Sequence, residues 1–148
     1  MTGTPRKALL AASIFGICDG MMSILGVALD LRGHPEVVLR AALLGAVSAG
    51  LSMAVAQHLS EDNDSTLPAA IAIGISTAAG TALPALPCAL LHGAAAIGGT
   101  GAVCGLLAVA VALLRGHGDA RRILLALVLL ASVFAVTVAC TLLTPGGA

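Results

Sequence analysis

The chain has 148 residues, of which 59% are hydrophobic and 9% are charged, and seven basic and seven acidic residues give a formal net charge of zero. A water-soluble domain carries about 25% charged residues, so this composition excludes a soluble globular protein and predicts an integral membrane protein. The balanced charge also excludes a nucleic-acid-binding protein, which needs a basic patch.

The first apolar run covers residues 8–29 and contains one acid, Asp19, within the stretch GICDGMMSILG. At about 1.5 Å per residue this run reaches about 33 Å, which is enough to cross a hydrocarbon core of about 30 Å. A cleaved signal peptide preceded by Arg6 and Lys7 is the alternative. The length of the run and its central acid favour a membrane-spanning helix.

Four further apolar runs follow, at residues 37–60, 67–91, 93–115 and 120–143. Thr66 is expected to cap the third helix and Gly118-Asp119 to precede the fifth. Pro84 and Pro87 predict a kink or a break within the third helix. The sequence therefore predicts a single transmembrane domain over residues 1–148, an all-α membrane protein with five transmembrane helices.

Small residues recur at helical spacing in three of the runs. They are Gly16 and Gly20 in the first run, Ala42, Ala46, Gly50 and Ala54 in the second, and Gly101 and Gly105 in the fourth. Such stripes let helix backbones approach closely. They predict tight helix packing and self-association, so we expect a homodimer.

Basic residues predict the orientation. A cytoplasmic N-terminus places five of them inside (Arg6, Lys7, Arg115, Arg121 and Arg122) and two outside (Arg32 and Arg40). Five helices then place the C-terminus outside. One lysine against six arginines, with abundant alanine and glycine, is typical of a high-GC bacterium, so we expect the bacterial plasma membrane.

Asp19 is the first candidate for chemistry, because an ionised carboxylate at the bilayer centre costs several kcal/mol. A hydrogen bond to a neighbouring helix is the structural alternative. Met22 shares its helix face, Met53 and Gln57 share a face of the second helix, and His58 lies on an adjoining one. Oxygen and sulfur ligands together suit Fe²⁺ or Mn²⁺, so these five residues form the predicted metal site. A methionine in an apolar helix can equally be core filler.

Three stretches resemble motifs of one family in the same order. The stretch SIFGICDGMMSILGVA resembles the first-helix pattern G-x-x-D-G of the vacuolar iron transporter (VIT) family. The stretch GLSMAVAQHLS resembles the second-helix signature of that family, S-M-A-x-G-E-Y-x-S. The stretch LPALPC resembles its P-L-x-P turn in the third helix. The resemblance implies a homodimer that exports Fe²⁺ or Mn²⁺ from the cytosol in exchange for protons, between the first two helices of both copies. It matches Asp19 and Met53 to pathway residues and Ser52 and Ser60 to the signature serines.

The chain departs from this family at two places. Ala56-Gln57-His58 stand where the family has Gly-Glu-Tyr, and Gln57 cannot take a charge. The family's large cytoplasmic metal-binding insert is replaced by the short link SEDNDST, which attracts cations weakly or is a solvated turn.

The sequence thus predicts a membrane transporter for Fe²⁺ or Mn²⁺ with proton antiport, in which the metal is a transported substrate and no cofactor is bound. The alternative is a non-transporting membrane scaffold that keeps the fold and has lost the pathway. An enzyme is not expected, because the sequence has no Ser-His-Asp arrangement, phosphate loop or H-E-x-x-H motif.

Overall fold

The computed structural model describes residues 5–31, 33–60, 67–116 and 119–143 of the protein. These residues form five helices, α1 (Pro5–Asp30), α2 (Pro35–Ser60), α3 (Leu67–Leu90), α4 (Gly93–Gly116) and α5 (Ala120–Leu143). All five are long and apolar enough to cross a membrane, and the described residues contain no strand. The all-α architecture is confirmed, and each helix end lies within three residues of its predicted position.

Local sequence signals account for the helix starts. Pro5 and Pro35 are the first residues of α1 and α2, where a missing backbone N–H costs nothing. Asp119 caps α5, because its Oδ1 accepts a hydrogen bond of 3.0 Å from the backbone N–H of Arg121. The cap predicted at Thr66 lies outside the described residues.

Of the kink or break predicted at the two prolines, the break is wrong, because α3 continues through both Pro84 and Pro87. Pro84 is buried, so packing against the neighbouring helices holds this part of α3 in place. The helix ends at Leu90, three residues after Pro87. Gly93 then adopts a φ of 59° at the start of α4, a left-handed conformation that favours glycine.

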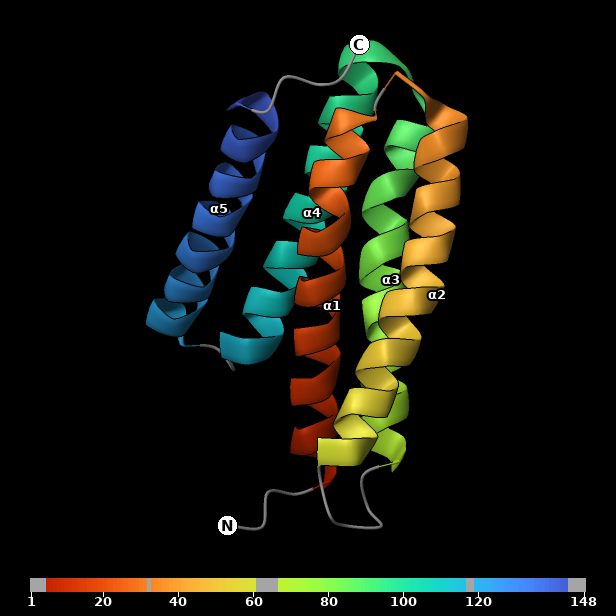
Figure 1. Ribbon diagram of the computed structural model, residues 1–148. Coiled ribbons are helices and arrows are strands. Elements are labelled where there is room, and N and C mark those ends of the chain that lie inside the picture. Colours follow the sequence, from red (N-terminus) through yellow and green to blue (C-terminus); the bar gives the residue numbers. More distant parts are fainter. Residues whose placement is uncertain (1–4, 32, 61–66, 117–118, 144–148) are drawn as a thin grey trace.

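Helix α3 is the centre of the molecule. Both α1 and α2 pack mainly against α3 and touch one another much less. Figure 1 shows this group of three, with α4 and α5 beside it. In the most apolar 18-residue stretch of α3, 56% is buried inside the protein. In the corresponding stretch of α5, only 6% is buried.

Glycines bring α1 and α3 into backbone contact. A Cβ atom added at Gly16 would clash with the side chain of Ser76, and one at Gly20 with the carbonyl oxygen of Thr77. From the other side, a Cβ at Gly80 would lie 2.5 Å from the carbonyl oxygen of Ile17. The predicted G-x-x-x-G contact of the first helix is confirmed, and its partner is α3.

The stripe in α2 meets α3 in the same way. A Cβ at Gly50 would lie 2.7 Å from the carbonyl oxygen of Gly74, and a Cβ at Gly74 would lie 2.9 Å from that of Gly50. The buried residues of α2 include Ala42 and Ala46, as the small-residue pattern predicted.

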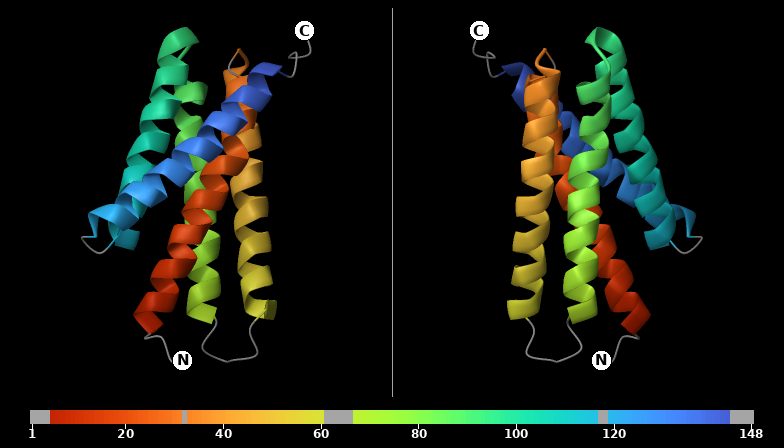
Figure 2. Two further views of the ribbon diagram at one scale, coloured as in Figure 1. Left: turned by 90° about the vertical axis from the view of Figure 1, so that its left-hand side faces the viewer. Right: turned by 90° about the vertical axis from the view of Figure 1, so that its right-hand side faces the viewer.

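The third small-residue pair does not pack closely within the chain. A Cβ at Gly101 or Gly105 would meet nothing within 4 Å. Both glycines line an apolar cavity of about 330 Å³ between α1, α4 and α5. This expectation of a close helix contact is therefore wrong for the single chain, because α5 crosses α1 diagonally and stands away from α4 at this level (Figure 2).

The helices alternate in direction, so the start of α1 and the end of α5 lie toward opposite ends of the bundle (Figure 1). The start of α1, the end of α4 and the start of α5 lie toward the same end, which groups Arg6, Lys7, Arg115, Arg121 and Arg122 there. The connected ends of α4 and α5 stop part-way along α1 in every view (Figures 1 and 2).

The glycine contacts give a direct test of the α1–α3 packing. Gly20→Ala and Gly80→Ala should each destabilise the protein by about 1–3 kcal/mol, because the added methyl group meets backbone atoms. Gly105→Ala should be neutral or stabilise by up to about 1 kcal/mol, because the position is open and alanine favours helix. Thermal unfolding in detergent, followed by circular dichroism, measures the difference. Equal melting temperatures for the three variants would contradict the packing.

Candidate functional site

Asp19 lies near the middle of α1. It is fourteen residues from Pro5 and eleven from Asp30, which corresponds to about 21 Å and about 16 Å along the helix. The residue is partly exposed, and the hydroxyl of Ser23 donates a hydrogen bond of 2.8 Å to its backbone carbonyl. No side chain in the described part of the chain bonds to the Asp19 carboxylate. The structural alternative of a bond to a neighbouring helix is therefore not seen within the described residues.

A first pocket, the α1–α2 pocket, lies on the N-terminal side of Asp19 and has a volume of about 570 Å³. The first half of α1, the last half of α2 and the start of α3 form its walls. Its polar and sulfur-bearing groups come from α2 and are those of Met53, Gln57 and Ser60. Phe15, one turn before Asp19, lies at its edge on α1 and is 56% exposed.

A second pocket, the α1–α5 pocket, lies on the C-terminal side of Asp19 and has a volume of about 460 Å³. The last halves of α1 and α5 form it, where α5 crosses α1 (Figure 2). It contains a thioether, a carboxylate, a thiol and three hydroxyl groups, from Met22, Asp30, Cys140, Ser23, Thr137 and Thr141.

Hydroxyl groups in the α1–α5 pocket present lone pairs rather than hydrogens. Thr137 donates to the carbonyl oxygen of Val133 at 3.0 Å, and Thr141 donates to that of Thr137 at 2.9 Å. Ser23 donates to Asp19 in the same way. The hydroxyl oxygens of Ser23 and Thr137 therefore retain acceptor capacity, which suits a cation and not an anion.

Both pockets open on one face of α1, and Asp19 lies between them. Phe15, Asp19 and Ser23 follow one another at four-residue spacing, and Met22 lies three residues after Asp19. Along this face of α1, Asp19 therefore lies between the residues that line the α1–α2 pocket and those that line the α1–α5 pocket.

The five residues of the predicted metal site fall into separate places. Met53 and Gln57 line the α1–α2 pocket, and Met22 lines the α1–α5 pocket. Asp19 lies between the pockets, and His58 is exposed and lines neither of them. Over the described ranges no three His, Cys, Asp or Glu residues gather closely enough to hold a metal ion. One copy of the chain thus brings Met53 and Gln57 together, and leaves the other three apart.

The two signature serines lie on α2 with local partners. Ser52 is exposed, and its hydroxyl donates to the carbonyl oxygen of Ala49 at 3.1 Å. Ser60 donates to that of Gln57 at 3.0 Å and lines the α1–α2 pocket.

Sequence reasoning missed the contribution of α5 to this site. Cys88 and Cys104 are buried, whereas Cys140 is exposed in the α1–α5 pocket. The signal was present as Thr137, Cys140 and Thr141, three polar residues within five positions near the end of α5.

Comparison of the chain with protein-family models, with curated proteins and with solved structures gave no significant match.

The surroundings of Asp19 predict a small effect on stability. Asp19→Asn should change the free energy of unfolding by less than about 0.5 kcal/mol, because the carboxylate holds no described side chain in place. Asp119→Ala should cost about 1 kcal/mol, because it removes the cap of α5. Thermal melting of both variants in detergent makes the comparison. A loss of several kcal/mol in Asp19→Asn would reveal a structural role for the acid.

Proposed function

We propose that the protein is a membrane transporter that moves a divalent transition-metal ion, Fe²⁺ or Mn²⁺, along the Asp19 face of α1 in exchange for protons. The observation that carries this proposal is the position of Asp19, mid-helix, without a described side-chain partner and between two pockets that contain oxygen and sulfur groups. Ionisable residues inside membrane spans are rare and mark ion pathways.

Competition between metal and proton at one carboxylate supplies the coupling. A metal ligand must be deprotonated, so a metal ion that reaches Asp19 displaces its proton. A proton that arrives from the opposite side later releases the metal. This exchange needs a carboxylate that both sides can reach, and the two pockets flank Asp19 along α1.

A second copy of the chain completes the site in this proposal. With the Asp19 faces of two α1 helices opposed, two carboxylates neutralise one divalent cation and remove most of the charge penalty of crossing the bilayer. The second copy also supplies a second Met53 and a second Met22, which one chain holds in separate pockets.

The resemblance of the first three helices to the VIT family motifs supports three parts of the proposal. These are Fe²⁺ or Mn²⁺ as the transported ion, a homodimer as the assembly, and export from the cytosol as the direction of transport. In that orientation the α1–α2 pocket receives the metal from the cytosol, and the α1–α5 pocket lies on the exit side. The membrane is then the bacterial plasma membrane.

A non-transporting scaffold is the competing function. The observation that favours it is the lack of a three-residue group of His, Cys, Asp or Glu over the described ranges, together with Gln57 where the family has glutamate. The two functions make different predictions. A transporter moves metal in a way that depends on Asp19, whereas a scaffold moves no metal.

Metal uptake into liposomes tests the proposal. Wild-type protein reconstituted around a metal-sensitive dye should take up Fe²⁺ or Mn²⁺ when the lumen is acidic. Asp19→Asn should lower the initial rate at least about tenfold, because loss of even an outer-shell partner of a metal ligand costs about 10- to 100-fold. Glu36→Gln, which neutralises an exposed acid at the start of α2, should leave the rate unchanged.

The outcomes separate the two functions. Equal uptake by wild type and Asp19→Asn would remove Asp19 from the pathway. No uptake by wild type, together with no protection of expressing cells against toxic iron or manganese, would favour the scaffold.

The proposed dimer places the Asp19 faces of two α1 helices together, and cross-linking tests this. In a background with Cys18 and Cys140 replaced by alanine, Phe15→Cys should form a disulfide-linked dimer on oxidation in membranes. Leu44→Cys, 73% exposed on α2, should stay monomeric because it lies on the face opposite the buried α2 stripe. A dimer band for Leu44→Cys alone would place the interface elsewhere.

A further inference from the structure

The connected ends of α4 and α5 hold a third pocket, the α4–α5 pocket, with a volume of about 370 Å³. Arg115 from the last turn of α4 and Arg122 from the first turn of α5 line it. The remaining walls are apolar and come from Leu125, Ala126 and Leu129 of α5. The pocket is therefore basic at its end and apolar along its length.

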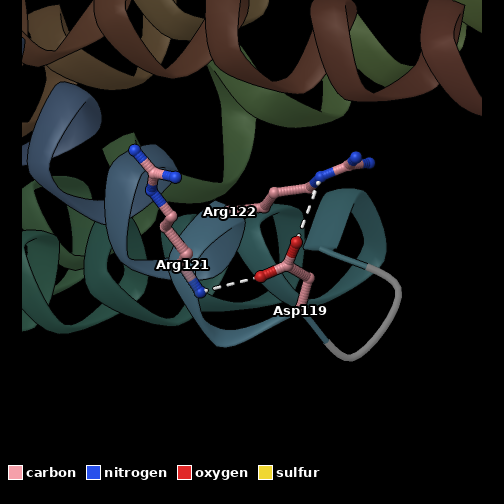
Figure 3. A network of polar contacts seen from close by, with 3 residues as sticks. All are labelled: Asp119, Arg121 and Arg122. Atoms are coloured by element: carbon pink, nitrogen blue, oxygen red, sulfur yellow. Dashed lines mark hydrogen bonds and ion pairs between the residues drawn. The ribbon is translucent and has the colours of Figure 1, made fainter.

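Asp119 organises the basic end. Its Oδ1 accepts from the backbone N–H of Arg121, and its Oδ2 lies 3.3 Å from Nε of Arg122 (Figure 3). The ion pair uses Nε, and Figure 3 shows the terminal nitrogens of Arg122 extending past the carboxylate. The two arginines that line the pocket, Arg115 and Arg122, exceed the single carboxylate of Asp119 by one positive charge.

The apolar part of the pocket identifies what kind of anion fits. Leu125 and Leu129, which follow Arg122 along α5, are 54% and 62% exposed. A small soluble anion gains nothing from leucine side chains. A phospholipid places its phosphate among guanidinium groups, whose planar fork matches phosphate oxygens, and lays an acyl chain along the leucines.

Along α4, the pocket lies at the far end of a membrane-length segment. Arg115 lies twenty-two residues after Gly93, about 33 Å along α4, so α4 spans about one hydrocarbon thickness between its first residue and this arginine. Basic pockets between membrane helices bind anionic headgroups of the adjacent leaflet.

We propose that the α4–α5 pocket is a binding site for one anionic phospholipid, with the phosphate held by Arg115 and Arg122 and an acyl chain packed on Leu125 and Leu129. The pocket shares no lining residue with the α1–α2 and α1–α5 pockets, so the proposal does not depend on metal transport.

Lipid titration of the full-length protein tests the proposal. Native mass spectrometry in detergent should show the first phosphatidylglycerol binding more tightly than phosphatidylcholine with the same acyl chains. The double variant Arg115→Gln/Arg122→Gln should weaken phosphatidylglycerol binding about 30-fold and leave phosphatidylcholine binding unchanged. Arg40→Gln, which removes an exposed arginine of α2 outside the pocket, is the matched control and should bind like wild type.

A second variant shifts the affinity in the opposite direction. Asp119→Asn keeps a good helix cap and removes the carboxylate that pairs with Arg122. It should tighten phosphatidylglycerol binding about fivefold. This gain does not depend on how well the double variant folds.

Three results would overturn the proposal. One is equal affinity of the wild type for the two lipids. Another is an unchanged preference for phosphatidylglycerol in both the double variant and Asp119→Asn. The last is competition by glycerol phosphate at concentrations equal to the lipid, which would indicate an anion site without a lipid chain.

Discussion

Backbone contact between α3 and its two neighbours is the constraint on which the rest of the structure depends. Inside a bilayer, apolar side chains gain little from leaving lipid, so helices associate through close van der Waals packing. Gly16 and Gly20 supply that packing between α1 and α3, and Gly50 with Gly74 supplies it between α2 and α3. Because both neighbours are held by α3, one face of α1 stays open on either side of Asp19.

That open face explains how an acid is tolerated within an apolar helix. The Asp19 carboxylate has no described side-chain partner and sits between two pockets with oxygen and sulfur groups. A carboxylate locked to a neighbouring helix could not take part in the proposed exchange of protons for metal. The same open face leaves Met22 and Met53 in separate pockets, which is why the proposed metal site needs two copies of the chain.

Much of the fold could be predicted from the sequence, because apolar runs of membrane length fix where the helices lie. Asp19 stood out through its isolation from other charges. The sequence pattern could not predict which helices pack against each other. The same G-x-x-x-G motif makes a close contact with α3 at Gly16 and Gly20, yet an added Cβ would meet nothing within 4 Å at Gly101 and Gly105. The α1–α5 pocket was missed for the same reason: the crossing of α5 over α1 joins residues more than a hundred positions apart.

The central place of α3 also has a consequence for biogenesis. Synthesis proceeds from the N-terminus, so α1 and α2 enter the bilayer before their shared packing partner exists. The two helices touch each other little, and their glycine faces have nothing to close against until residues 67–90 are inserted. Assembly therefore waits for the third span, and the nascent chain carries its acidic helix through the insertion machinery without neighbours.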